Sequence, residues 1–308
     1  MQREIQMSEV IKVESLTKRY GTLEAVRGIS FHVNAGEVFS LLGPNGAGKT
    51  TTVEILEGVR KRTSGHVAVL GYDPEKIDET FRKRVGVLPQ DFNFLQRITP
   101  LEALEFFIGS LESGMDPVEL LKTVELVDRK DVYFSKLSGG QKQKLGIAIA
   151  LSNDAELVFL DEPTAGLDPI SRKSIQQVMR NLRSLGKTIF LTTHYLEEAE
   201  KLADRVAIVN HGIIVDEGTP EELVQKNKTH DTLVVSLAMD HATETALPKG
   251  LVMKSPGVYE MPVMSNDDLF SVLDSIAKSR IMVDNIYLKR ENLEDVFMRV
   301  VGAEPDES

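Results

Sequence analysis

Short, continuous apolar runs alternate with longer segments in which apolar residues recur at helical spacing. A short apolar run is typical of a strand buried on both faces, whereas spacing of about three to four residues is typical of a helix. From residue 140 onward the alternation is regular. It predicts helices at 140–151, 169–185 and 195–202, and strands at 157–160, 188–192, 206–209 and 213–215.

The upstream half of the chain shows the same two patterns in a different order. Residues 10–13 and 25–33 predict N-terminal antiparallel strands with a turn at 18–21, and 38–42, 67–70 and 85–88 predict further strands. Residues 100–127 predict a long, largely helical stretch within an insertion at about 90–150. Alternating strands and helices predict an α/β fold with a mainly parallel sheet, covered by helices on both faces.

A polar, unpatterned stretch at 225–231 marks a boundary, so we expect domains at 1–228 and 229–308. The second domain has strand patterns at 233–237, 250–254, 258–263 and 281–288 and helix patterns at 266–278 and 292–300. No catalytic motif falls in this small α/β module. Residues 302–308 are expected to form a frayed acidic tail.

Composition removes several classes of function. The chain has no cysteine, which excludes disulfides, zinc–thiolate clusters and thiol catalysis. Neither a signal peptide nor a run of about 20 apolar residues is present, so we expect a cytoplasmic protein. The net charge of −11 disfavours a nucleic-acid partner, and the basic runs 60–62 and 82–84 are interpreted as solvated faces.

A phosphate-binding loop (Walker A) follows the strand at 38–42. Its glycines allow backbone N–H groups to converge on phosphate oxygens, and the next helix directs its positive end at the same place. Lys49 is expected on the β- and γ-phosphates, and the Thr50 hydroxyl on Mg²⁺. The loop comprises Gly43, Pro44, Asn45, Gly46, Ala47, Gly48, Lys49, Thr50 and Thr51.

Two further motifs carry chemistry. The apolar strand at 157–160 ends in Asp161, a candidate for the Mg²⁺ shell, and Glu162, which is placed to polarise an attacking water. Upstream, Leu137-Ser138-Gly139-Gly140-Gln141 opens a helix and forms a second anion-binding nest. A single nucleotide site does not need two such nests.

Six motifs in this order resemble the nucleotide-binding subunits of ABC transporters over about residues 10–225. The motifs are the phosphate loop, the family signature at 137–141, the strand at 157–162, a D-loop at 165–168, a Q-loop at Gln90, and a switch histidine in Thr192-Thr193-His194. The Asn292-Leu293-Glu294-Asp295-Val296-Phe297 segment resembles the C-terminal extension of the ABC-2 exporter subfamily.

The resemblance implies an ATPase with ATP and Mg²⁺ that works as a head-to-tail homodimer. In that dimer Ser138, Gly139, Gly140 and Gln141 of one copy would cover the γ-phosphate held by Lys49 of the other. Tyr20 would stack on adenine, Gln90 would reach Mg²⁺ or water, His194 would orient the water, and Asp168 would contact the partner's phosphate loop. A separate membrane permease, on whose inner face the chain would sit, is the implied partner.

Alternatives remain open at this stage. A soluble ABC-type ATPase acting in translation or DNA maintenance would usually join two such domains or carry a coiled coil. A GTPase or kinase leaves the second nest unexplained, and Glu162 and His194 disfavour an adaptor without turnover. Lys144 stands where many family members have arginine, and lysine lacks the planar fork for bidentate pairing. Phe92 and Phe94 are either permease contacts or core residues.

Overall fold

The structure, a computed structural model, describes residues 8–109, 111, 115–237, 250–279 and 282–302. It consists of two compact units, Met1–Pro220 and Glu221–Ser308. The domain boundary expected after residue 228 stays a prediction. The helix α8 (Pro220–Asn227) precedes that point, and its last carbonyl, on Asn227, accepts a hydrogen bond from Arg299 of α10 (Leu293–Val301).

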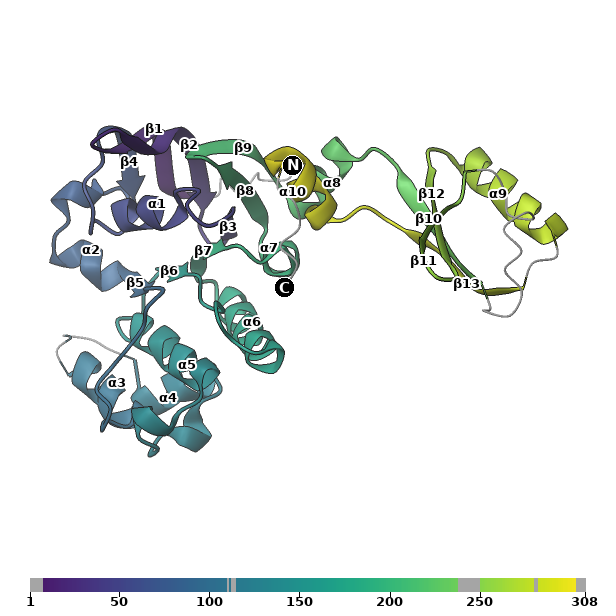
Figure 1. Cartoon of the computed structure of the whole chain (residues 1–308). Helices are drawn as coiled ribbons and strands as arrows, with labels where there is room; N and C mark the ends of the chain where they lie inside the picture. The colour runs from purple at the N-terminus through teal and green to yellow at the C-terminus, as the bar shows by residue number, and fades with distance from the viewer. Residues whose placement is uncertain (1–7, 110, 112–114, 238–249, 280–281, 303–308) are drawn as a thin grey trace, which may run out of the picture. The chain divides into compact units, whose positions relative to one another are not determined.

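A six-stranded sheet forms the centre of the first unit (Figure 1). Its first five strands are parallel, and the last pairs antiparallel with its neighbour. The α/β fold with a mainly parallel sheet is therefore confirmed. In spatial order the strands are β5 (Val85–Leu88), β6 (Leu157–Asp161), β7 (Thr188–Thr193), β3 (Val38–Leu42), β8 (Arg205–Asn210) and β9 (Ile213–Gly218).

Both faces of this sheet are buried, because successive strand residues enter different cores. In β6, Val158 and Leu160 join a core with the helices α3 (Pro100–Ile108), α4 (Pro117–Thr123), α5 (Gly139–Ala150) and α6 (Pro169–Ser184). Leu157 and Phe159 join the opposite core with α1 (Lys49–Leu56). That core also contains an antiparallel sheet of β2 (Leu23–Asn34), β1 (Glu9–Tyr20) and β4 (Ser64–Val69).

One local prediction in the first unit is wrong. Residues 18–20 are not a turn, because Lys18 and Arg19 pair with β2 and β1 continues to Tyr20. The stretch 100–127 is largely helical, as predicted, but it divides into two helices: α3 ends at Ile108, and α4 begins at Pro117 behind an Asp116 cap. Proline at the first position starts a helix well but cannot continue one, which favours two separate helices.

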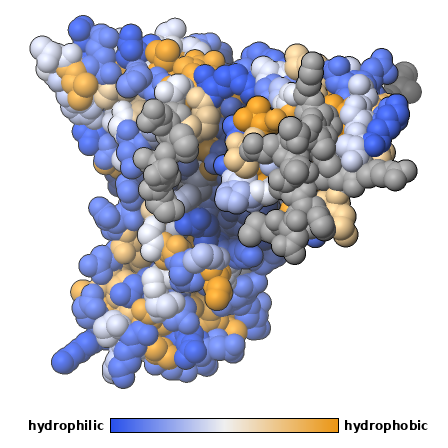
Figure 2. Space-filling model, turned by 45° about the vertical axis from the view of Figure 1, so that its right-hand side comes forward, coloured by the Kyte–Doolittle hydropathy of each residue, from blue (hydrophilic) through white to orange (hydrophobic). Residues whose placement is uncertain are grey.

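The aromatic residues ahead of α3 pack inward. Phe92 and Phe94 are half-buried against the helical core, and their ring centroids lie 6.0 and 6.4 Å from that of the buried Phe134. Core packing therefore accounts for both rings. Leu95 and Phe106, 67% and 69% exposed, are the outward-facing apolar side chains of this region. Figure 2 shows apolar residues scattered among polar ones over the lower lobe, which α3, α4 and α5 form in Figure 1.

Neighbouring carboxylates neutralise much of both basic runs. Arg62 makes two hydrogen bonds to Asp73, at 2.7 and 3.0 Å, and Arg60 pairs with Glu54. In the second run Arg84 makes two hydrogen bonds to Glu156, at 2.7 and 2.9 Å. In the part of the chain that the structure describes, no helix is long and apolar enough to cross a membrane.

The second unit contains a four-stranded antiparallel sheet with α9 (Asn266–Ser279) on one face (Figure 1). The strand order is β11 (Val252–Ser255), β12 (Val258–Val263), β10 (Asp231–Leu237) and β13 (Val283–Lys289). Residues 303–308 of the expected acidic tail lie outside the described residues. The remaining regular elements are η1 (Pro74–Lys76), α2 (Glu79–Arg84), η2 (Val127–Arg129), η3 (Phe134–Lys136) and α7 (Leu196–Leu202).

Candidate active site

The phosphate loop joins β3 to α1 at the carboxyl end of the parallel strands, where ligands bind in such sheets. Gly48 directly precedes α1 with φ of 101°, a conformation that side chains rarely adopt. A Cβ atom there would lie 2.5 Å from the carbonyl oxygen of Ala25, and one on Gly43 would lie 2.3 Å from that of Val209. Both glycines are therefore required by close backbone approach.

A cavity of about 350 Å³ lies over this loop. It is lined by Gln90 and Glu162, by Tyr20, Leu23 and Ala25 of the N-terminal strands, and by the loop residues Asn45, Gly46, Gly48, Lys49, Thr50 and Thr51. Tyr20 is 38% exposed, and Lys18 Nζ and the Arg60 guanidinium carbon lie 4.9 and 5.3 Å from its ring centroid. An aromatic ring beside a phosphate loop suits a ligand with both a flat base and phosphates.

Lys49 sits at the floor of this cavity and is 5% exposed. Its Nζ donates hydrogen bonds to the carbonyl oxygens of Gly43 and Pro44, at 2.7 and 3.2 Å. It also pairs with Oε1 of Glu162 at 3.1 Å. The lysine ammonium is thereby aimed from the start of α1 towards the carboxylate that follows β6, a strand separated from β3 by β7.

Glu162 connects the lysine to the histidine. Its second oxygen, Oε2, lies 2.7 Å from Nδ1 of His194. The backbone of Glu162 has φ of 49°, which is unusual for a non-glycine residue, and its N–H donates to the carbonyl and hydroxyl oxygens of Thr192. Such strain persists only where neighbours hold it, and here it turns a carboxylate that is only 5% exposed towards both Lys49 and His194.

Asp161, one residue earlier, is also buried. Burial raises the pKa of Asp161, while hydrogen bonds from the hydroxyls of Thr192 and Thr50 lower it. Thr192 lies directly opposite Asp161 in the parallel pairing of β6 with β7. A single threonine side chain therefore contacts both neighbouring carboxylate residues, because it also accepts from the N–H of Glu162.

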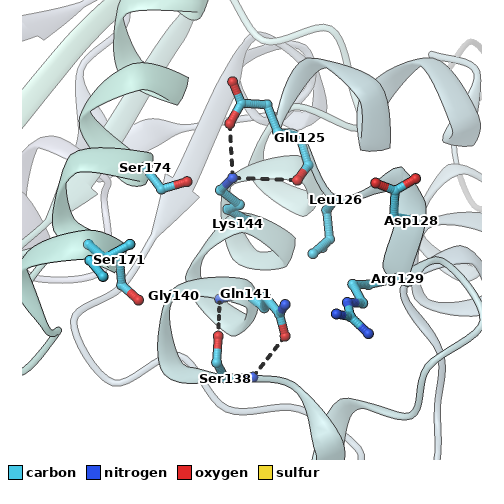
Figure 3. A pocket seen from close by; sticks show the side chains of 11 residues that line it. Glu125, Leu126, Asp128, Arg129, Ser138, Gly140, Gln141, Lys144, Ser171 and Ser174 are labelled. Atoms are coloured by element: carbon cyan, nitrogen blue, oxygen red, sulfur yellow. Dashed lines mark hydrogen bonds and ion pairs between the residues drawn. The ribbon is translucent and has the colours of Figure 1, made fainter.

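The second nest lines a separate cavity of about 320 Å³ (Figure 3). Ser138 caps α5: its hydroxyl accepts from the N–H of Gln141, whose side chain accepts from the N–H of Ser138. Figure 3 shows Ser171 facing this turn from α6. Deeper in the cavity, Lys144 Nζ lies 3.1 Å from the Glu125 carboxylate and 3.4 Å from the Glu125 carbonyl oxygen.

Asp168 caps the next helix, α6. Its carboxylate accepts from the N–H groups of Ile170 and Ser171 and, at 2.6 Å, from the Ser171 hydroxyl. The Ser171 side chain is the main cause of a lowered pKa of Asp168. Ser171 therefore links the Asp168 turn to the signature turn of the same chain.

The structure thus separates the expected site residues into two groups. Tyr20, the phosphate loop, Gln90, Asp161, Glu162 and His194 gather at one cavity or directly beside it, and Ser138, Gly140 and Gln141 line the other. Sequence reasoning missed Thr192 and Ser171 as partners of these residues. Nothing local in the sequence distinguishes them, because each acts through a neighbouring strand or helix.

A phosphate loop on a parallel sheet, with a carboxylate at the end of a second parallel strand paired with its lysine, defines a phosphate-loop ATPase. Residues 26–165 match the family described as "ABC transporter". The chain is 37% identical to the fluoroquinolones export ATP-binding protein of Mycobacterium tuberculosis, over 96% of this chain and 94% of that protein. It is also 37% identical to the Nod factor export ATP-binding protein I of Paraburkholderia xenovorans, over 96% of this chain and 97% of that one.

Solved structures agree with these relatives. A dimeric ATP-binding cassette in a post-hydrolysis state, bound to ADP and Pi, matches with a TM-score of 0.60 and 28% identity, over 68% of this chain and 98% of that chain. A nucleotide-free cassette from an ABC transporter matches with a TM-score of 0.63 and 26% identity, over 71% of this chain and 94% of that chain. The chain belongs to the ABC transporter family. It is an ATP-binding subunit whose ATP hydrolysis is coupled to transport.

Proposed function

We propose that this chain drives export through a separately encoded membrane permease by ATP-dependent pairing of two copies of its first unit. Export is supported by the names of relatives that match along nearly the whole chain. Pairing is supported by the dimeric cassette among the similar structures. The Asn292–Phe297 segment favours an ABC-2 type permease, against which the chain would lie on the inner face of the membrane.

The observation that carries the proposed chemistry is the contact of Glu162 with both Lys49 and His194, at 3.1 and 2.7 Å. Lys49 would bind the β- and γ-phosphates and stabilise the charge that develops on them. Glu162 would accept a proton from the attacking water, and His194 would orient that water and the γ-phosphate. Gln90 lines the same cavity and is exposed, so it would transmit the change between the ATP-bound and hydrolysed states to the permease.

The oxygen atoms of Asp161 and Thr50 fit Mg²⁺. The Asp161 carboxylate is buried, and burial raises its pKa, so an adjacent cation would favour its charged form. Carboxylate and hydroxyl oxygens are the ligands that Mg²⁺ prefers, and Gln90 lines the same cavity. The ion would neutralise phosphate charge, while this chain's own side chains hold the nucleotide and the water.

Each chain would contribute half of each of two ATP sites: its phosphate loop to one site and the turn that starts at Ser138 to the other. The turn of Ser138 and Gly140 presents N–H groups at a helix start, yet it lines a cavity apart from the one above Lys49. A second copy placed head to tail would set this turn against the γ-phosphate. Asp168 would then approach the partner's phosphate loop, and Tyr20 would stack on adenine at the far end of the cavity.

Substitution of Glu162 tests this proposal. Glu162→Gln removes the base but keeps the shape of the side chain, so we expect turnover to fall by about 100-fold or more while ATP affinity is retained. With ATP and Mg²⁺ the variant should accumulate as a dimer in light scattering. As a control, Glu197→Gln removes a charge from an exposed position of α7 and should keep the turnover and the oligomeric state of the parent protein. Normal turnover of Glu162→Gln, or a strictly monomeric variant, would contradict the proposal.

A further inference from the structure

The segment that carries His194 is held on both sides by its neighbours in the chain. Thr193 ends β7, and Tyr195 directly precedes α7. The Thr193 hydroxyl oxygen accepts a hydrogen bond from the N–H of Tyr195 at 2.9 Å. The rings of His194 and Tyr195 lie 4.0 Å apart between centroids. The orientation of His194 is therefore coupled to whatever fixes Thr193 and Tyr195.

Glu198 fixes Thr193. This glutamate in the first turn of α7 is fully buried, and its Oε2 accepts a hydrogen bond from the Thr193 hydroxyl at 2.8 Å. Burial raises the pKa of Glu198, and the hydroxyls of Thr164 and Thr193 and the charge of Arg172 lower it. A buried carboxylate is costly unless it is well partnered, so an apolar residue would fill this space with less penalty.

Arg172 fixes Tyr195. Its guanidinium carbon lies 3.9 Å from the centre of the Tyr195 ring, a cation–π contact. The backbone N–H of Arg172 bonds to the carbonyl oxygen of Asp168, so this arginine belongs to the first turns of α6. Its charge also attracts the buried Glu198. Arg172 on α6 and Glu198 on α7 therefore interact electrostatically, and each contacts a residue next to His194 in the chain.

Three polar atoms in the cluster of Thr164, Arg172, Thr193 and Glu198 make no hydrogen bond of good geometry with the described residues. Within the described residues, Oε1 of Glu198, the Thr164 hydroxyl and Nε of Arg172 are buried without a hydrogen-bond partner of good geometry. Buried polar groups in native proteins are nearly always satisfied. These three atoms, one of them on the Glu198 carboxylate itself, come from the segments of Glu162, Asp168 and His194, so the cluster joins all three segments.

We propose that Glu198 is a positioning residue, which sets the orientation of His194 through Thr193 and links it through Arg172 to the helix capped by Asp168. A change at the Asp168 turn would then alter how His194 meets Glu162, although Glu198 itself touches neither the nucleotide nor the attacking water. This inference rests on the proposed role of Glu162 and His194 in hydrolysis.

Thr193→Val gives the sharpest test, because it removes the hydroxyl bridge and keeps the shape of the side chain. We expect kcat to fall by about tenfold while KM and ATP affinity change by less than about twofold, since orientation is lost and binding is not. The His194 ring resonance, assigned in ¹³C-histidine-labelled protein by its loss in His194→Asn, should shift. Thr193→Ser should restore both kcat and the resonance.

Glu198→Gln and Glu198→Ala test the carboxylate itself. The glutamine variant keeps an acceptor for Thr193 but loses the attraction of Arg172, so its kcat should lie between those of the parent and Thr193→Val. The control is Glu200→Gln, which removes the same charge from an exposed position of α7 and should change nothing. If Glu198→Ala does not fold, Glu198→Gln decides the role of the carboxylate, because Thr193→Val also removes the acceptor of the Tyr195 N–H.

The outcomes separate this inference from the proposed function. If Glu162→Gln and His194→Ala hydrolyse ATP normally, the proposed function itself fails. If both lose turnover while folded Thr193→Val keeps a kcat and a His194 resonance like those of the parent, only the role of Glu198 is overturned. A parallel fall in kcat and in thermal stability, without any shift of the His194 resonance, would also overturn it.

Discussion

Gly140 packs so closely against Ser171 that a Cβ atom on the glycine would lie 2.8 Å from that of the serine. The contact joins the first turn of α5 to the first turn of α6 within one chain. Packing within one chain therefore requires glycine at position 140, independently of its proposed position over the γ-phosphate of a partner. The Ser171 hydroxyl in turn donates a hydrogen bond to the Asp168 carboxylate. Ser171 therefore contacts both the signature turn and the Asp168 turn.

Gly140→Ala should destabilise the folded chain even without nucleotide. Overpacking of this kind costs about 1–3 kcal/mol of unfolding free energy. In a Ser171→Gly background most of the clash disappears, so the same substitution should cost at least about 1 kcal/mol less. Chemical unfolding of the four proteins of this double-mutant cycle measures the difference. An equal cost in both backgrounds would show that the contact is unimportant.

The ATPase assay separates the two reasons for this glycine. We expect the double variant to recover stability but not turnover, because a methyl group at Gly140 also obstructs the N–H groups that would face the partner's γ-phosphate. Full recovery of turnover in the double variant would contradict the proposed role of Gly140 in the composite site.

Lys49→Ala should weaken ATP binding by about 10- to 100-fold, the loss expected for one charge-assisted hydrogen bond. Isothermal titration calorimetry with ATP and Mg²⁺ measures it directly. Lys201→Ala, which removes an exposed ammonium paired with Glu197, serves as the matched control. Unchanged affinity of Lys49→Ala would overturn the assignment of the phosphate loop.

Lys144 should tolerate arginine but not an apolar residue. Its ammonium is almost fully buried and pairs with the half-exposed Glu125 carboxylate, so Lys144→Arg keeps the charge and should change kcat by less than about twofold. Lys144→Met removes the pair and should lower the unfolding free energy by about 1 kcal/mol. Thermal unfolding and steady-state kinetics of both variants test this. A larger defect in the arginine variant would show that lysine is specifically required.

Glu57, at the end of α1, should make the fold less stable as pH rises. Burial, with smaller contributions from Asp161 and Glu54, raises its pKa from 4.5 to about 8. The folded state therefore binds a proton that the unfolded state releases between these values, so this contribution to stability is complete below pH 4.5 and is lost on approaching pH 8.

Glu57→Gln should remove that pH dependence. Because part of the side chain reaches solvent, we expect a gain of about 2–3 kcal/mol at pH 8, below the value of the full pKa shift. Urea unfolding at pH 5, 6.5 and 8, without nucleotide and with a chelator, measures the slope, and Glu200→Gln is the exposed control. A slope shared by all three proteins would contradict the role of Glu57.

Motifs whose geometry is local were readable from the chain. The phosphate loop needs only a strand, a glycine-rich turn and a helix in sequence, and each has its own pattern around Lys49. The signature turn is likewise a helix start with a capping serine, Ser138. Residues 18–20 were misread because polar strand residues in an exposed ladder resemble a turn, and only pairing with β2 reveals the strand.

The sequence by itself determined the α/β fold, the phosphate loop and the order of the motifs, because each depends on periodicity or on residues near one another in the chain. Tertiary structure alone decided the contacts between strands and helices. It placed Thr192 between Asp161 and Glu162, and Glu198 beside Thr193, the residue before His194. These contacts depend on register and packing across the sheet, which no local pattern specifies.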